Sequence, residues 1–175
     1  MKTVRILIAE DSKAIRKALI RQLEPCGAEI ISAENGMLGL AKVREHIPDL
    51  VVTDIEMPKM NGFDFCRALK AEASTRHIPV VILSANESEE FIERGFEVGA
   101  AAYVPKTSAG QELLPCVRDI LEKSMLLLNK RILVVDDSTT IRKIIAQGLS
   151  GAGFQVDQAA DGQEAILFLE DQNPD

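Results

Sequence analysis

The chain has 175 residues, of which 46% are hydrophobic and only 4% aromatic, so a largely aliphatic core is expected. Its formal net charge of −7 disfavours nonspecific binding to nucleic acid or to an anionic membrane. The three cysteines are widely separated and indicate neither a disulfide framework nor a zinc site. No apolar stretch is long enough for a signal peptide or a membrane span, so a cytoplasmic location is expected.

Short aliphatic runs alternate with helix-type patterns along the first 128 residues. A continuous aliphatic run is typical of a strand that is buried on both faces, and apolar residues at helical spacing follow each run. Strands are therefore predicted at 4–9, 30–33, 50–53, 79–83 and 101–104. Five strands that alternate with five helices indicate parallel crossovers, so we expect an α/β fold with a doubly wound (βα)5 sheet.

Two helix starts carry capping signals. Asn86, with Glu89 three residues later, predicts the N-cap of the fourth helix, and Ser108 with Gln111 predicts a capping box for a long last helix. That last helix ends in the apolar run 125–128, which either packs on its own domain or meets a second module or a partner chain.

The opening of the chain is repeated later in the sequence. The segment Leu7–Ser12 returns as Leu133–Ser138, shifted by 126 residues, and the register stays ungapped over the whole aligned length. The repeat predicts one complete domain over residues 1–128. Residues 129–175 are then expected to be the N-terminal part of a second domain, with the element order β-α-β-α.

Polar side chains terminate four of the predicted strands, namely Glu10 and Asp11, Asp54, Ser84, and Lys106. Because the carboxyl ends of parallel strands meet at one edge of a sheet, these side chains are expected to converge. Three carboxylates in one place repel one another, and a hard divalent cation such as Mg²⁺ relieves that repulsion. A phosphoryl group on Asp54 would then lie between the metal and Lys106, with the Ser84 hydroxyl as a hydrogen-bond donor.

These residues and their neighbours resemble the receiver domain of response regulators in two-component signalling. The resemblance rests on the acid pair Glu10-Asp11, the run Asp54–Pro58 followed by Asn61-Gly62, Ser84-Ala85, and Tyr103 three residues before Lys106. It covers residues 4–125 fully and 130–175 in part. It implies a flavodoxin-like sheet with the strand order 2-1-3-4-5.

The resemblance also implies a role for each acidic residue. Asp54 is similar to the family's phosphoacceptor. Asp11 is similar to the direct metal ligand, and Glu10, Asp54 and the backbone carbonyl of Glu56 would complete a site for Mg²⁺ or Mn²⁺. Glu10 stands where aspartate is commoner in the family, and its longer side chain is expected to alter a water-mediated contact with the metal.

Three further residues resemble the parts of a receiver that respond to the phosphoryl group. Lys106 is similar to the lysine that pairs with the phosphate, and Ser84 to the switch hydroxyl. Tyr103 is similar to the switch aromatic, whose ring turns inward once Ser84 is drawn to the phosphate. Thr107 follows Lys106 where proline is usual, and since non-proline cis bonds are costly, the family's cis peptide is not expected here.

The function implied by the resemblance is phosphorelay signalling. A histidine kinase or a phosphotransfer protein would phosphorylate Asp54, and the changed surface would control an output such as a diguanylate cyclase or a hybrid kinase. The only catalysis expected is the chain's own phosphorylation and dephosphorylation, so it is not expected to be an enzyme. The family also implies a homodimer through the face of the fourth helix, fifth strand and fifth helix, without direct binding to nucleic acid or membrane.

The partial second copy carries Asp136-Asp137 where the first copy carries Glu10-Asp11. The counterpart of Asp54 would lie five residues beyond the last residue, so the chain is expected to be a fragment of a longer protein. Without a third strand, one edge of the first strand of this copy would have no partner. Strand exchange with a second copy could cover this edge, or the edge could be poorly ordered.

Three alternatives compete with this function. A magnesium-dependent phosphatase would need its nucleophile on the first strand, with a second aspartate two residues later, whereas Asp54 lies on the third strand. A flavin carrier would need phosphate donors in its first loop, where Glu10 and Asp11 would repel a phosphate. An adaptor that is never phosphorylated would not need the complete site.

Overall fold

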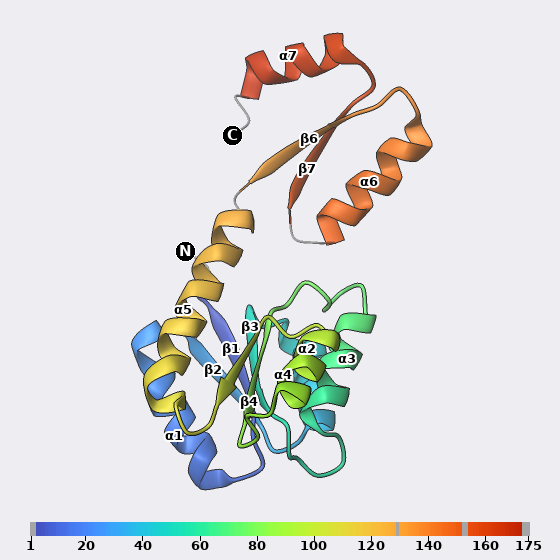
Figure 1. Cartoon of the computed structure of the whole chain (residues 1–175). Helices are drawn as coiled ribbons and strands as arrows, with labels where there is room; N and C mark the ends of the chain where they lie inside the picture. The colour runs from blue at the N-terminus through green and yellow to red at the C-terminus, as the bar shows by residue number, and fades with distance from the viewer. Residues whose placement is uncertain (1–2, 129, 152–153, 173–175) are drawn as a thin grey trace. The chain divides into compact units, whose positions relative to one another are not determined.

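A computed structural model describes residues 3–128, 130–151 and 154–172, although not the side chains of residues 125–128 and 171–172. The packing predicted for the apolar run 125–128 therefore lies outside the described side chains. The chain divides into two compact units, Met1–Leu121 and Glu122–Asp175, which are called the first and the second unit below (Figure 1).

The first unit contains a five-stranded parallel sheet with the order β2-β1-β3-β4-β5. This order and the α/β fold class confirm the prediction. Two of the interior strands, β3 and β4, are buried along their whole length, as their continuous aliphatic sequences predict. The strands are β1 Arg5–Ala9, β2 Glu29–Ala33, β3 Leu50–Asp54, β4 Val80–Ser84 and β5 Ala102–Pro105.

Helices cover both faces of this sheet, as Figure 1 shows. One core lies between the sheet and helices α1 and α5, and the other lies between the sheet and helices α2, α3 and α4. The helices are α1 Lys13–Leu23, which continues into the 3-10 turn η1 Glu24–Cys26, α2 Gly36–His46, α3 Gly62–Ala71, α4 Glu89–Glu97 and α5 Ala109–Leu128. Two cores with a sheet between them leave the carboxyl edge of the strands open to solvent.

Side-chain caps fix where three of these helices begin. The side-chain oxygens of Ser12, Asn35 and Asn61 each accept a hydrogen bond from the backbone amide three residues later. Each cap satisfies an amide that has no partner inside its helix, and each places a helix start directly after the carboxyl edge of the sheet.

Two capping predictions were wrong in their details. Ser88 is the N-cap residue of helix α4 and makes no side-chain cap hydrogen bond. Asn86 instead accepts the Ser88 amide through Oδ1 at 2.9 Å, in a turn before the helix. Ser108 stands directly before α5, as predicted, and its carbonyl accepts the amides of Gln111 and Glu112, but its hydroxyl donates to the carbonyl of Pro105 at 3.3 Å. Both residues can bond to nearby backbone outside a helix, which the sequence spacing alone does not reveal. All peptide bonds among the described residues are trans, including the bond between Lys106 and Thr107.

The second unit has two parallel strands and two helices in the order β6-α6-β7-α7. This confirms the incomplete second fold. The elements are β6 Arg131–Val135, α6 Thr139–Gly151, β7 Gln155–Ala159 and α7 Gly162–Gln172. Among the residues with described positions, no helix combines the length and the apolar character needed to cross a membrane.

Candidate functional site

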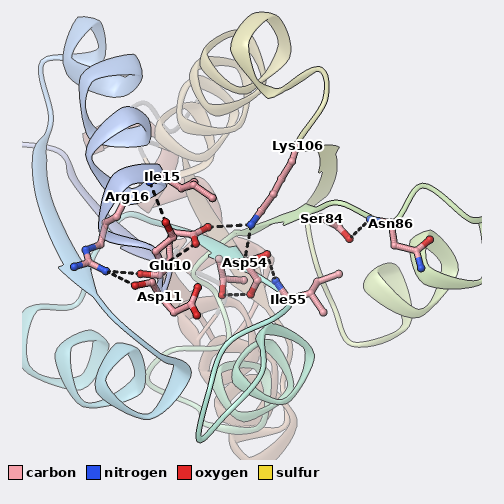
Figure 2. Close-up of polar contacts among 11 residues, drawn as sticks. Glu10, Asp11, Ile15, Arg16, Asp54, Ile55, Ser84, Asn86 and Lys106 are labelled. Atoms are coloured by element: carbon pink, nitrogen blue, oxygen red, sulfur yellow. Dashed lines mark hydrogen bonds and ion pairs between the residues drawn. The ribbon is translucent and has the colours of Figure 1, made fainter.

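The predicted site residues of the first unit lie at the carboxyl edge of its sheet, as Figure 2 shows for most of them. Glu10 and Asp11 follow β1, Asp54 is the last residue of β3, and Lys106 follows β5. Glu10 and Asp54 are almost completely buried, with 1% and 4% exposure, whereas Asp11 is exposed. One acid of the site therefore faces solvent, and two are held in the protein.

Three carboxylates form an acid cluster, which consists of Glu10, Asp11 and Asp54. One oxygen from each residue lies within 4.8 Å of the others, and no other group of three potential metal ligands is found among the described residues. Such a donor set suits a hard cation with oxygen ligands, of the kind that Mg²⁺ and Mn²⁺ prefer. The chemistry of the acid cluster therefore fits the predicted metal.

Lys106 is the cation of the site. Its Nζ lies 2.8 Å from Oδ2 of Asp54 and 3.1 Å from Oε2 of Glu10. Burial alone would lower the pKa of Lys106, but the hydrogen bonds and negative charges of Asp54 and Glu10 outweigh it, and the net pKa is raised. Lys106 therefore stays protonated and offsets part of the negative charge.

The pKa of Glu10 is raised although its carboxylate is paired with Lys106. Burial raises the pKa of Glu10 most, the charge of Asp54 raises it further, and the contacts with Lys106 and the Ser12 amide lower it in part. The Ser12 amide donates to Oε1 of Glu10 at 3.1 Å, which fixes one oxygen of the carboxylate. A second cation at the acid cluster would favour the ionised form of Glu10.

The backbone around Asp54 holds its carboxylate in one orientation. The amide of Ile55 donates to Oδ1 of Asp54 at 2.8 Å, while Oδ2 faces Lys106. The chain then returns so closely that a Cβ on Gly62 would lie 2.1 Å from the Asp54 carbonyl oxygen. The glycine of the Asn61-Gly62 motif is therefore required by packing at the site, and the amide of Gly62 donates to the Ile55 carbonyl at 2.9 Å.

Arg16 supports the acid loop, which consists of Glu10 and Asp11 after β1, although no role was predicted for Arg16 from the sequence. Its Nη1 donates to the backbone carbonyls of Glu10 at 2.6 Å and of Asp11 at 3.3 Å (Figure 2). The signal that could have found it is the repeat, because Arg16 and Arg142 are identical at equivalent positions.

Ser84 and Tyr103 are joined through the backbone of Asn86. The Ser84 hydroxyl oxygen accepts the Asn86 amide at 2.9 Å, and the Asn86 carbonyl accepts the Tyr103 hydroxyl at 2.6 Å. The half-buried Tyr103 ring also packs against α4, where a Cβ on Gly95 would lie 2.9 Å from it. The predicted switch pair is thus physically connected, through a residue that the sequence assigned to a helix cap.

The remaining predicted site residues are Glu56 in the first unit and Asp136 and Asp137 in the second. Glu56 is exposed and lies in the loop after β3. Asp136 and Asp137 follow β6 in the second unit, where the amide of Ser138 donates to Oδ1 of Asp136 at 2.8 Å. Within the described part of the second unit, no third acidic ligand joins them.

This fold and this site define a class of signalling domain. The chain belongs to the response regulator receiver domain family, whose model matches residues 6–118. Receiver domains are switches of two-component phosphorelays that interact with histidine kinases or phosphotransfer proteins and bind Mg²⁺ in an acidic pocket. They are generally not enzymes. The matched residues lie in the first unit, and a second copy of the domain is not included in the match.

Parts of both regulators and histidine kinases are similar to this chain. It is 34% identical over 121 residues to the response regulator MprA of a Mycobacterium species, a match that covers 69% of this chain and 52% of MprA. It is 36% identical over 125 residues to histidine kinase P4 of Formosa agariphila, covering 71% of this chain and 9% of that protein. The chain therefore corresponds to about half or less of these relatives.

Solved structures agree with the fold. A putative response regulator from Chloroflexus aurantiacus superimposes with a TM-score of 0.66 and 28% identity, covering 69% of this chain and 99% of the other. The chemotaxis response regulator CheY4 of Vibrio cholerae gives a TM-score of 0.64 and 28% identity, covering 68% and 99%.

Proposed function

We propose that Asp54 accepts a phosphoryl group from a phosphohistidine on a histidine kinase or phosphotransfer protein. One carboxylate oxygen of Asp54 forms a bond to phosphorus, the bond between phosphorus and the histidine nitrogen breaks, and that nitrogen keeps the electron pair and takes up a proton. The observation that carries this proposal is the Asp54 carboxylate, which is buried yet within 2.8 Å of Lys106 and 4.8 Å of two further acids.

The acid cluster would hold Mg²⁺ or Mn²⁺ through Asp11, Asp54 and, directly or through water, Glu10, together with the backbone carbonyl of Glu56. The metal, when bound, supplies positive charge that offsets both the acids and the incoming phosphoryl oxygens. Asp11 suits the role of direct ligand because it is exposed, whereas Glu10 is buried and already paired with Lys106. Lys106, whose Nζ lies 2.8 Å from Asp54, supplies a second positive charge.

Ser84 and Tyr103 would then change their contacts when Asp54 is phosphorylated. When the Ser84 hydroxyl turns to donate to a phosphoryl oxygen, it gives up the amide of Asn86 as its donor. The Asn86 carbonyl holds the Tyr103 hydroxyl, so a shift of this short segment moves both the ring and its packing against α4. The surface formed by α4, β5 and α5 would carry the signal to a homodimer partner or an output domain.

The domain organisation is part of the same proposal. Residues 1–128 form the receiver, and residues 129–175 form the N-terminal part of a second receiver that begins with Asp136-Asp137. The output would be a diguanylate cyclase, a hybrid kinase or another effector, and the action of the receiver would be cytoplasmic and confined to its own phosphorylation and hydrolysis. The kinase relative and the regulator relative support this setting, because both contain a segment similar to this chain.

The proposal is tested by intact-protein mass spectrometry after incubation with acetyl phosphate and Mg²⁺. The chain should gain one phosphoryl group, and Asp54→Asn should gain none. The matched control is Asp137→Asn, which changes an acid of the second unit and should leave the gain intact. No gain by the parent chain, or an equal gain by Asp54→Asn, would contradict the proposal.

A further inference from the structure

Two loops at the carboxyl edge of the sheet carry the residues that would contact a phosphoryl group on Asp54. Residues 85–88 lead from Ser84, at the end of β4, to the start of α4, and residues 106–108 lead from β5 to α5 and begin with Lys106. The strands β4 and β5 are neighbours, and the Lys106 amide donates to the Ser84 carbonyl at 2.7 Å. The two loops, called the β4–α4 loop and the β5–α5 loop below, therefore start side by side.

Each loop is folded on itself by short-range hydrogen bonds. In the β4–α4 loop, the Asn86 amide donates to the Ser84 hydroxyl oxygen, as Figure 2 shows, and the Ser88 amide donates to Oδ1 of Asn86, both at 2.9 Å. In the β5–α5 loop, the Ser108 amide donates to the Pro105 carbonyl at 3.2 Å. A displacement of Asn86 therefore changes the hydrogen bonds of the whole β4–α4 loop.

A contact between two side chains joins the two loops. The Thr107 hydroxyl donates to Oε1 of Glu87 at 2.6 Å, and this hydrogen-bonded pair is called the latch below. Both residues are exposed, so the latch is not part of either core. It depends on the residue types, since the hydroxyl at position 107 is the donor and proline, which is usual there in the family, has none. The latch is therefore a feature of this chain that the fold itself does not require.

We propose that Thr107 is a positioning residue, whose latch with Glu87 holds the β4–α4 loop in its unphosphorylated conformation. The inference rests on the proposed role of Ser84 and Tyr103 in the response to phosphorylation. It goes beyond that role because it assigns a function to a contact between two exposed side chains. It also names the hydrogen bond that must break before the β4–α4 loop can move.

The β5–α5 loop is the fixed partner of the latch. Thr107 follows Lys106, whose Nζ lies 2.8 Å from Oδ2 of Asp54. Lys106 keeps a negatively charged partner when Asp54 is phosphorylated, so the backbone beside Thr107 stays anchored. Glu87 instead follows Asn86, whose amide loses its hydroxyl partner in the proposed response. Movement of the β4–α4 loop therefore separates Glu87 from Thr107.

A contact that exists in only one of two conformations shifts the equilibrium between them. The latch stabilises the unphosphorylated conformation, so its removal should raise the population in which Asn86 and the Tyr103 ring have moved. An analogue of the phosphoryl group that favours the moved conformation should then bind more tightly. Because the hydrogen bond of the latch is exposed, the expected gain in affinity is modest, about threefold.

The test titrates the full chain with beryllofluoride and Mg²⁺, a stable analogue of the phosphoryl group. Tyr103 is the sole tyrosine of the sequence, so carbon-13-labelled tyrosine gives ring signals in NMR spectra from this residue alone. Thr107→Val removes the hydroxyl at nearly equal volume, and its Tyr103 signals should reach their bound positions at a concentration about threefold lower than in the parent. Thr107→Ser keeps the donor and should match the parent. Equal titrations of the parent and Thr107→Val would overturn the proposal.

A double-mutant cycle tests the acceptor of the latch. Glu87→Ala should have the same effect as Thr107→Val, and the double variant should show no further change, because either substitution alone removes the hydrogen bond. Glu90→Ala is the matched control, since it removes an exposed glutamate three residues further along the chain and should leave the titration unchanged. Additive effects of Thr107→Val and Glu87→Ala would overturn the proposal.

Solvent exchange of the Asn86 and Ser88 amides in the chain without beryllofluoride is a readout that does not depend on phosphorylation. Both amides donate within the β4–α4 loop, so their exchange should be about threefold faster in Thr107→Val and unchanged in Thr107→Ser. Equal exchange in all three chains would overturn the latch. A parent chain that binds no beryllofluoride would instead contradict the proposed function, so the two fail separately.

Discussion

The Nζ atom of Lys106 lies 2.8 Å from Oδ2 of Asp54, which ties the residue after β5 to the last residue of β3 across the intervening strand β4. The same nitrogen reaches Glu10 at 3.1 Å, after β1. A single cation therefore joins three strand ends, and any group added to Asp54 must either engage Lys106 or displace it.

Removal of this cation should strengthen metal binding. In Lys106→Ala the acid cluster loses its internal counter-charge, so the affinity for Mg²⁺ should rise by on the order of tenfold. Isothermal titration calorimetry at low ionic strength measures the change. Lys42→Ala is the control, because Lys42 donates to the Ser32 carbonyl and has no place in the cluster. An unchanged or weaker affinity in Lys106→Ala would show that Lys106 does not compete with the metal.

Replacement of the exposed acid should have the opposite effect. Asp11→Asn should weaken Mg²⁺ binding and slow phosphorylation by acetyl phosphate by more than about tenfold, since it removes a carboxylate ligand. Asp137→Asn removes the equivalent acid of the second unit and should change neither quantity. If the two variants lose activity equally, the first unit does not contain the metal site.

Gly62 should be intolerant of any side chain. In Gly62→Ala the added Cβ would lie 2.1 Å from the Asp54 carbonyl oxygen, and the backbone must move to relieve the overlap. We expect a loss of about 1–3 kcal/mol in the free energy of unfolding, measured by urea denaturation. A Cβ at Gly110 meets nothing within 4 Å, so Gly110→Ala should be neutral or slightly stabilising. Equal stability of the two variants would contradict the close packing at Asp54.

The three cysteines should differ in reactivity. Burial raises the pKa of the Cys66 thiol from 9.0 to about 11, and Cys66 is fully buried, while Cys26 and Cys116 are only partly buried. The reactive thiolate of Cys66 is then about 100-fold scarcer near neutral pH than that of an ordinary thiol. Peptide mapping after brief iodoacetamide treatment should find Cys66 alkylated last. Early alkylation of Cys66 in the folded chain would show that its side of the core opens readily.

The convergence of the site could be predicted from sequence because it follows from topology. Once the strands are parallel, the residues after their last aliphatic positions must meet at one edge, and this placed Glu10, Asp54 and Lys106 together. Contacts made by backbone atoms could not be predicted from the sequence. The link from Ser84 to Tyr103 runs through the amide and carbonyl of Asn86, groups that every residue but proline has, so no residue type marks them.

The role of Arg16 could not be predicted for the same reason, although here the donor is a side chain. Its guanidinium binds two carbonyls of the acid loop, and a carbonyl leaves no trace in the sequence. Asn86 failed as a predicted cap for a related reason, because its amide side chain bonds to a turn just before the helix as readily as to the helix itself.

The central claim is that Asp54 carries the phosphoryl group, and borohydride trapping tests it most directly. An acyl phosphate is reduced by borohydride, which converts the phosphorylated aspartate into homoserine, and peptide mass spectrometry then identifies the residue. After treatment with acetyl phosphate and Mg²⁺, homoserine is predicted at position 54 alone. Homoserine at position 11, 136 or 137, or the absence of any reduced aspartate, would contradict the account.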